Sequence, residues 1–485
     1  MPGSWSQLGE AFLGTNDNDG VGRSVSLSSD GRIVAFGVPG SDVGYTNSGQ
    51  ARVYEWKEGS WQQRGQFIDG TGEYNDAGWS VSLTPDGNTL AVGARYNGDG
   101  YYNAGHVRVY GWDSISSTWQ QRGMSINGEG TQDWSGWSVS MSMNGTVLAI
   151  GAPNNNGGTG HVRVHEFNGT QWVPKGQAIV GKYANEKSGE SVSMSADGNI
   201  LAIGAPSNSV NNANSGNVRV FQWNSLLVKW EQRGLDINGV DIEERVGISV
   251  SISSNGNTLA IGSPGSFSTS GHVSVYDWDS TSLKWERRGQ SIDDNLAGNG
   301  AGRAVSLSAD AQRVAIGMPS YNGYDVWTGG VKVYEWKSTV LGWVQIGHTI
   351  DGQYKFGSSG SYLALSPDGT RLVVGAPGWL GVGHVGKGHV KVYEYTPPPP
   401  PPTMSISIPS SAITLSRIGR GLPQGRYISS VTNVIEGSVT FSCQGYTNGE
   451  FTQAGVFTGT WTATNGEGSV TESRPFLVLA SSWDV

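Results

Sequence analysis

The fold is decided by residues 78–93, which read Gly78-Trp79-Ser80-Val81-Ser82-Leu83-Thr84-Pro85-Asp86-Gly87-Asn88-Thr89-Leu90-Ala91-Val92-Gly93. The first six residues alternate between small polar and apolar types, a period of two that is typical of a strand. Residues 84–88 are typical of a tight turn, in which Gly87 suits a positive φ. The apolar run 90–93 predicts a second short strand, so the stretch reads as a β-hairpin.

Two further strand patterns follow this hairpin. Residues 107–112 (Val-Arg-Val-Tyr-Gly-Trp) alternate again, and residues 119–123 (Trp-Gln-Gln-Arg-Gly) come after a short turn. No segment shows the helical period of 3.6 residues over a useful length. We therefore expect an all-β unit of four antiparallel strands.

The unit is repeated seven times between about residues 4 and 395. Successive tryptophans of its Trp-x-x-x-Gly element are 56, 58, 53, 58, 55 and 58 residues apart; the pairs are Trp5-Gly9, Trp61-Gly65, Trp119-Gly123, Trp172-Gly176, Trp230-Gly234, Trp285-Gly289 and Trp343-Gly347. A β-solenoid uses shorter rungs, and separate sandwiches need about 100 residues each. Radial repetition of four-stranded units predicts a seven-bladed β-propeller.

The two ends of the array predict how the ring closes. The first unit begins with only its fourth-strand element at Trp5, and the last stops after its third strand, which ends at Tyr395. The N-terminal strand can therefore complete the last blade and remove two open sheet edges. The propeller is expected over residues 1–396.

The spacing between landmarks separates a constant framework from variable loops. The repeat tryptophan precedes the first-strand glycine by 17 residues in all seven units, and the second-strand glycine follows 15 residues later. The next interval, which contains the loop between strands two and three, varies from 9 to 13 residues. In an antiparallel blade this loop emerges on the same face as the blade-to-blade loop. A rigid scaffold with variable loops is the usual layout of a binding surface, so we expect this face to be the functional one.

Aromatic residues in these loops are the candidate ligand-binding residues, because aromatic rings dominate recognition hot spots. They are Tyr101, Tyr102, Trp134, Tyr321, Tyr324, Trp327 and Trp379. The alternative for each is packing over its own loop. Trp79 and Trp137 follow the first-strand glycine, where other units carry Arg23, Glu190, Ile248, Arg303 and Ser361; this variation is suggestive, but burial between blades is an equally good interpretation.

Composition limits the classes of function. The chain of 485 residues carries a formal net charge of −9, which argues against binding nucleic-acid phosphates. No apolar run approaches the roughly 20 residues of a membrane helix, so no membrane insertion is expected. The N-terminus has neither the basic nor the apolar part of a signal peptide.

Patterns of catalytic or metal-binding residues are missing. The four histidines in Gly-His-Val settings fall on different predicted blades, so they cannot converge on zinc. No nucleophile elbow, phosphate loop or zinc-protease motif is present. The sequence thus predicts no catalytic residue, no metal site and no cofactor. Acidic residues are common in the loops, so a pair of facing carboxylates stays open as an alternative.

The tail begins with six consecutive prolines at 397–402, which predict a stiff polyproline linker. Residues 403–485 show short alternating segments at 413–415, 438–442, 457–463 and 476–479, from which we expect a small immunoglobulin-like β-sandwich. Residues 459–471 (Gly-Thr-Trp-Thr-Ala-Thr-Asn-Gly-Glu-Gly-Ser-Val-Thr) resemble the last hairpin of bacterial-type immunoglobulin-like modules.

The propeller units resemble FG-GAP repeats, as in the integrin α-subunit propeller. The matching stretches include Gly136-Trp137-Ser138-Val139-Ser140, Leu148-Ala149-Ile150-Gly151-Ala152-Pro153 and Gly160-His161-Val162-Arg163-Val164. The resemblance implies a seven-bladed propeller and, by analogy, extracellular recognition or adhesion. It also implies calcium loops, but a short Ser-x-Asp-Gly turn stands at that place here, so the loop sequences themselves support no calcium site.

We therefore expect a non-catalytic recognition or adhesion protein that binds a protein or glycan through the variable-loop face. The resemblance and the low charge favour an extracellular, cell-surface or virion-surface location. Two alternatives stay open: a structural cell-surface or virion component, which an apolar patch on the loop face would favour, and a polysaccharide-active enzyme, which two carboxylates in a funnel would favour.

Overall fold

The computed structural model describes residues 3–265, 270–323, 327–378 and 386–398, and the backbone of seven further strands within 403–478. The chain divides into two compact units, Trp5–Tyr395 and a second that comprises Met1–Ser4 with Thr396–Val485.

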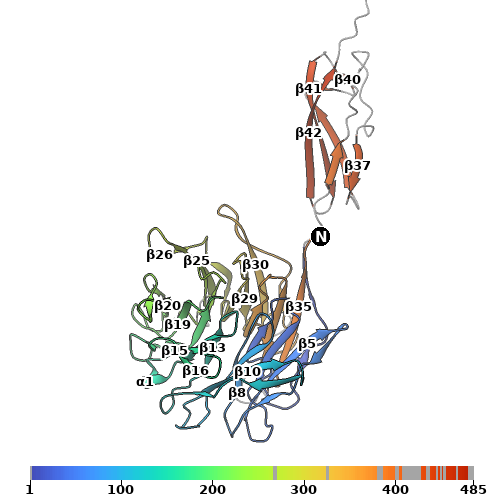
Figure 1. The fold of residues 1–485 in the computed structure, drawn as a ribbon. Helices are drawn as coiled ribbons and strands as arrows, with labels where there is room; N and C mark the ends of the chain where they lie inside the picture. The colour runs from blue at the N-terminus through green and yellow to red at the C-terminus, as the bar shows by residue number, and fades with distance from the viewer. Residues whose placement is uncertain are drawn as a thin grey trace, which may run out of the picture. The chain divides into compact units, whose positions relative to one another are not determined.

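The unit Trp5–Tyr395 contains seven antiparallel sheets, which follow one another around a ring in chain order (Figure 1). The prediction of a seven-bladed β-propeller is confirmed. The one helical segment in the described ranges is the single turn α1 (Asn155–Gly158) in a loop.

Each blade has four strands, which lie side by side in chain order from the ring axis to the outer edge. The first, inner strands are β3 (Val25–Leu27), β8 (Ala77–Leu83), β13 (Ser138–Met141), β18 (Ser191–Met194), β23 (Ser249–Ile252), β28 (Ala304–Leu307) and β33 (Tyr362–Leu365). The second strands are β4 (Ile33–Val38), β9 (Thr89–Ala94), β14 (Val147–Ala152), β19 (Ile200–Ala205), β24 (Thr258–Ser263), β29 (Arg313–Met318) and β34 (Arg371–Ala376). The third strands are β5 (Gln50–Lys57), β10 (His106–Asp113), β15 (His161–Phe167), β20 (Asn217–Asn224), β25 (Ser270–Asp279), β30 (Gly330–Ser338) and β35 (His389–Thr396).

The fourth, outer strands come in two pieces that both pair with the third strand. The first pieces are β6 (Ser60–Gln63), β11 (Thr118–Gln121), β16 (Trp172–Pro174), β21 (Lys229–Gln232), β26 (Lys284–Arg287), β31 (Gly342–Gln345) and β1 (Ser4–Gln7). The second pieces are β7 (Ile68–Asp69), β12 (Ile126–Asn127), β17 (Ile179–Val180), β22 (Ile237–Asn238), β27 (Ile292–Ala297), β32 (Ile350–Asp351) and β2 (Phe12–Leu13). The sequence pattern predicted only the first pieces.

The N-terminal strand closes the ring as predicted. The last sheet has the order β1-β35-β34-β33, so β1 lies at the outer edge of a blade whose other strands come from the opposite end of the chain. The ring centroids of Trp5 and Tyr395 are 5.0 Å apart. The Trp5 indole N–H also donates to the Ile346 carbonyl of the preceding blade at 3.3 Å.

Apolar residues between blades form the core, in seven buried clusters that each combine two neighbouring blades. Close to the axis, the blades meet through glycines. A Cβ built on Gly93 would lie 2.3 Å from the carbonyl oxygen of Gly136 in the next blade, and one on Gly375 would lie 2.2 Å from that of Gly22. The two constant glycines of each unit therefore exist because the second strand of one blade contacts the first strand of the next.

Inner-strand serines join the same boundaries by hydrogen bonds. Ser80 Oγ donates to the Gly136 carbonyl at 2.7 Å, and Ser82 Oγ accepts from the Met141 N–H at 3.2 Å. Serine thus satisfies backbone groups where there is no room for a larger side chain.

The repeat tryptophan bridges neighbouring blades at the outer edge. Trp119 Nε1 donates to the Arg64 carbonyl of the preceding blade at 2.8 Å. A Cβ on Gly65 would lie 2.9 Å from Trp119, so the glycine of the Trp-x-x-x-Gly element leaves space for the next blade's indole. The element is a packing motif between blades.

The C-terminal unit contains β36 (Thr403–Ile406), β37 (Ile428–Thr432), β38 (Gly437–Cys443), β39 (Tyr446–Thr447), β40 (Glu450–Phe451), β41 (Gly455–Asn465) and β42 (Gly468–Val478). β38, β41 and β42 form a three-stranded sheet, while β36 pairs with β37 and β39 with β40. The strand expected at 413–415 lies outside the described residues, and the immunoglobulin-like sandwich stays a prediction.

Candidate functional site

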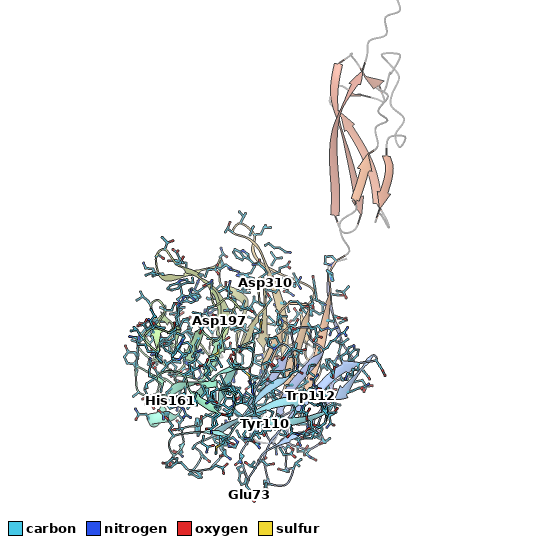
Figure 2. The ribbon with its side chains drawn as sticks, in the orientation of Figure 1. Glu73, Tyr110, Trp112, His161, Asp197 and Asp310 are labelled. Carbon is cyan, nitrogen blue, oxygen red and sulfur yellow. The ribbon has the colours of Figure 1, made fainter. Side chains whose placement is uncertain are left out.

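The variable loops and the blade-to-blade loops share one face of the propeller. The Gln132 N–H of a blade-to-blade loop donates to the Tyr102 carbonyl in a loop between strands two and three at 2.8 Å, and Tyr74 donates to Thr46 in the same way. We call this the loop face. The opposite turn face carries the Asp-Gly turns. Figure 2 shows Glu73 of a blade-to-blade loop and Asp310, which lies in the equivalent turn where Ala311 replaces the glycine, at opposite ends of the propeller.

A central pocket of about 260 Å³ lies on the propeller axis, lined by the three residues that follow the first-strand glycine in each of the seven blades. Two of the positions in its wall differ in how far the residue type varies between the seven blades. The third residue after each first-strand glycine is valine in six blades and Leu363 in the seventh. The first residue after the glycine differs widely from blade to blade: Arg23, Trp79, Trp137, Glu190, Ile248, Arg303 and Ser361.

Cations and aromatic rings alternate around part of the pocket. The Arg23 guanidinium carbon lies 3.5 Å from the Trp79 ring centroid and 4.4 Å from that of Tyr362. The Arg95 guanidinium carbon lies 2.9 Å from the same Trp79 ring. Two guanidinium groups cannot occupy one face of an indole at these distances, so Arg23 and Arg95 sandwich Trp79. Each such cation–π contact stabilises the cation by about 0.5–2 kcal/mol.

The series continues on the next two blades. The rings of Trp79 and Trp137 lie 5.1 Å apart, and Trp137 stacks on Trp134 at 5.5 Å with an interplanar angle of 19°. Lys187 Nζ then lies 5.4 Å from the Trp134 ring centroid. We call Tyr362, Arg23, Trp79, Arg95, Trp137, Trp134 and Lys187 the cation–aromatic belt.

Arg95 departs from the repeat pattern. The other six blades have proline at this place, at Pro39, Pro153, Pro206, Pro264, Pro319 and Pro377. Arg95 Nε forms an ion pair with Asp76 Oδ2 at 2.9 Å, and both side chains are largely buried. Burial raises the pKa of Asp76 above its usual value although Arg95 opposes the shift.

The charges around the pocket are mainly positive. Burial, together with the charges of Arg303 and Arg95, lowers the pKa of Arg23 to about 10, so Arg23 keeps its charge at neutral pH. Burial also raises the pKa of Glu190, against the opposing effect of Arg303, Lys187, Arg245 and Arg23. A carboxylate whose pKa is raised despite four neighbouring cations is strongly desolvated.

Backbone strain coincides with this site. The residue two places before each first-strand glycine has a left-handed φ in all seven blades. Glycine occupies it in two blades, whereas Asp76, Trp134, Lys187, Arg245 and Ser358 occupy it in the others, with φ from 51° to 60°. For a tryptophan this conformation is rare, and such strain clusters at functional sites.

Three loop carboxylates, by contrast, have structural roles. Asp19 and Asp133 are buried, and each accepts hydrogen bonds from two backbone N–H groups of its own loop. Glu186 likewise accepts from the Lys182 N–H and pairs with the buried Arg219. Within the described ranges, no group of three metal-ligating side chains lies close enough to hold a metal ion.

The predicted aromatic residues do not gather at one place. Trp134 belongs to the cation–aromatic belt, whereas Tyr101 and Tyr102 are 55% and 68% exposed in a variable loop. Tyr321 packs against an apolar cluster, and Trp327 contacts Phe356 at 5.8 Å. Tyr324 and Trp379 lie outside the described residues.

Sequence reasoning missed Arg95, Asp76, Lys187 and Arg245 as site residues. A signal was present for Arg95, because an alignment of the seven units shows it as the one residue that replaces proline. It also treated Trp79 and Trp137 as rim or packing residues, and Trp79 proves to be both buried and part of the pocket wall.

The most exposed aliphatic side chains lie on the turn face. Ile115, Leu226 and Val340 are 96%, 92% and 90% exposed, and each lies in a hairpin between third and fourth strands. Among the described residues no helix has both the length and the apolar character to cross a membrane.

Two solved structures are similar to this chain in shape. One is hydrazine synthase of Kuenenia stuttgartiensis, at 13% identity and a TM-score of 0.48, covering 75% of this chain and 94% of that one. The other is a "putative 6-phosphogluconolactonase" from Bacteroides uniformis, at 12% identity and a TM-score of 0.47, covering 67% of this chain and 84% of that one. No family model and no curated protein matches the sequence.

Proposed function

We propose that this protein is a non-catalytic recognition protein whose propeller binds a glycan or protein ligand on the loop face, with the central pocket as the primary site. The observation that carries the proposal is the divergence of one position. Ser and Val follow at the next two inner-strand positions in five of the seven blades, but the first residue after the glycine is cationic, aromatic, acidic, aliphatic or polar, depending on the blade. Packing alone would favour the same solution in every blade.

A further feature supports the proposal. The pocket combines apolar walls with a few polar groups, the usual composition of a ligand site.

The resemblance to FG-GAP repeats supports, by analogy alone, a role similar to that of extracellular adhesion modules. We propose a cell-surface or virion-surface location on that basis, with the C-terminal segment as an immunoglobulin-like anchor or spacer. The chemistry of the loops is compatible with this setting, since charged residues make up only 15% of the chain.

A glycan and protein array with the full chain tests the proposal. Trp137→Ala alters the pocket wall, Tyr101→Ala/Tyr102→Ala alters an exposed loop, and Met143→Ala is a matched control on the turn face. We expect binding to fall for Trp137→Ala and to persist for Met143→Ala, with melting temperatures recorded for all variants. Loss of binding only in the Tyr101/Tyr102 variant would move the site to the loop tips, and loss in the Met143 variant would overturn the assignment.

One observation favours a second candidate, a polysaccharide-active enzyme. Asp76 and Glu190 are both near the pocket and burial raises the pKa of each carboxyl. A raised pKa suits a general acid. Asp76 is, however, paired with Arg95, which leaves Glu190 as the freer group. Release of reducing ends from a polysaccharide by the intact protein, abolished in Glu190→Gln, would replace the binding proposal with this one.

A further inference from the structure

Two cationic side chains at the central pocket form no direct contact with a carboxylate among the described residues. Within the part of the chain that the structure describes, the Arg23 and Arg303 side chains make no hydrogen bond or ion pair, and both line the pocket. Arg303 lies 5.8 Å from the Tyr362 ring centroid, and Tyr362 also contacts Arg23. Both cations are thus held near one aromatic ring without a direct ion pair, although Glu190 interacts electrostatically with both.

The stacking of Arg23 determines which part of its guanidinium is available. Trp79 and Tyr362 contact it through their rings. The N–H donors of a guanidinium lie in its own plane, so a group held by its faces keeps its edges for other partners. Those edges match the two oxygens of a carboxylate, sulfate or phosphate.

The local charge differs in sign from that of the whole chain. Arg23 and Arg303 line the pocket, and Arg95, Lys187 and Arg245 lie close enough to affect its titratable groups. Three carboxylates accompany these five cations: Asp76 pairs with Arg95, Glu243 pairs with Arg245, and Glu190 lines the pocket. The chain as a whole carries a net charge of −9. A positive concavity in a negative protein focuses the field on the pocket and attracts anions there.

The pocket also contains an unpaired acceptor and an unpaired donor. The Glu190 side chain makes no hydrogen bond within the described ranges, although it lines the pocket. Trp79 is only 8% exposed, and its buried Nε1 has no hydrogen-bond partner there. A buried polar group without a partner costs about 1–3 kcal/mol, which a ligand with matching groups recovers.

These groups together describe one class of ligand. An oxyanion alone satisfies Arg23 and Arg303 but offers nothing to Glu190, which requires a hydroxyl or N–H donor. A sugar acid carries an oxyanion and several hydroxyls on one ring. The volume of about 260 Å³ suits one such compact residue rather than a helix or a strand.

We infer that the central pocket recognises an acidic saccharide, with its carboxylate or sulfate bound by Arg23 and Arg303 and its hydroxyl groups by Glu190, an inference that rests on the proposed function. Arg23 and Arg303 are the residues that select the anion. Glu190 selects a hydroxylated ligand over a simple acid.

The test is a glycan array of the full chain with three groups of probes: carboxylated, sulfated and neutral saccharides. The strongest acidic probe is then titrated by calorimetry against the wild type, Arg23→Gln, Arg23→Lys and Arg32→Gln. Arg32 is exposed on the turn face and provides the matched control. We expect affinity to fall roughly ten- to hundredfold for Arg23→Gln, less for Arg23→Lys, and not at all for Arg32→Gln.

The outcomes separate this inference from the proposed function. Binding of carboxylated probes alone, or of sulfated probes alone, identifies which oxyanion is the source. Binding of neutral saccharides or of a protein, unaffected by Arg23→Gln, overturns the inference and leaves the proposed function standing. An Arg23→Gln protein that melts below the wild type is replaced by Arg303→Gln, for which the same loss is expected. Binding of no probe of any class contradicts both.

Discussion

Trp5 and Tyr395 are 390 positions apart in the sequence, and their ring centroids lie 5.0 Å apart in the last blade. This contact joins the first strand of the propeller to its last. Trp5 also belongs to the buried cluster between the sixth and seventh blades, so the N-terminal strand contributes to the continuity of the core around the ring. The pocket on the axis is built from all seven blades, so its shape also depends on closure.

Trp5→Ala is expected to destabilise the propeller by about 3–5 kcal/mol, because Trp5 is 3% exposed and its removal leaves a large cavity. Met124→Ala, at a side chain 74% exposed, is the control and is expected to change stability by less than about 0.5 kcal/mol. Urea denaturation of the two variants measures the difference. Equal stability of Trp5→Ala and wild type would show that the ring closes without this strand.

The glycine contacts near the axis are tested by two substitutions in blade two. Gly93→Ala places a Cβ 2.3 Å from the Gly136 carbonyl oxygen, whereas a Cβ at Gly111 meets no atom within 4 Å. We expect Gly93→Ala to cost about 3 kcal/mol or more through displacement of backbone, and Gly111→Ala to be neutral or stabilising. Thermal melts distinguish the two; comparable melting temperatures would mean that neighbouring blades are not in backbone contact.

Buried histidines make the propeller sensitive to mild acid. Burial lowers the pKa of His106, His165 and His389 to about 4, against an ordinary value near 6.5. In mild acid the unfolded chain therefore binds protons at these histidines more readily than the folded chain does. The resulting loss of stability is absent above about pH 6.5 and grows as the pH falls towards 4. Each is expected to reduce the free energy of unfolding by up to about 3 kcal/mol at the acid end.

Denaturation curves at pH 7, 5.5 and 4 measure this loss. The loss should be shallower in His165→Asn, which removes one titrating group. Carboxylates whose pKa is lowered by hydrogen bonds, such as Asp197, contribute only at still lower pH. Stability that stays constant or rises from pH 7 to 4 would rule out neutral buried histidines.

Arg95→Gln is expected to cost about 2 kcal/mol, because it leaves the largely buried Asp76 carboxylate without its partner and removes a cation from Trp79. Asp76→Asn combined with Arg95→Gln should recover part of this cost. A double-mutant cycle by urea denaturation is expected to give a coupling energy of about 1–3 kcal/mol. Additive effects would show that the ion pair contributes nothing.

The framework of the fold could be predicted because each landmark has a local physical cause that repeats. The tryptophan of the Trp-x-x-x-Gly element packs against the glycine of the same element in the preceding blade. The number of times the element is repeated therefore gives the number of blades. Ring closure followed from the unmatched elements at Trp5 and Tyr395. Six of the seven second pieces of the outer strands have only two residues, such as Ile126 and Asn127, which are too few to show a period; the seventh, β27, has six.

The site was harder to predict, because its residues meet only on the axis. Arg23, Trp79 and Tyr362 come from three blades, and their contacts depend on how the ring brings the inner strands together. Loop length pointed to the loop face but favoured exposed residues such as Tyr101. The cations of the belt come from different repeat units, so they form no motif within any single unit. Only a comparison between the units singles out Arg95.

Hydrogen–deuterium exchange of the full chain, with and without the tightest ligand from the glycan and protein arrays, tests the central claim most directly. If the central pocket of the loop face is the binding site, amides in 74–79, 132–137 and 187–190 exchange more slowly with the ligand present, while the Asp-Gly turns at 84–88 and 195–199 do not change. Protection confined to those turns, with no effect at the three loop-face segments, would contradict the account.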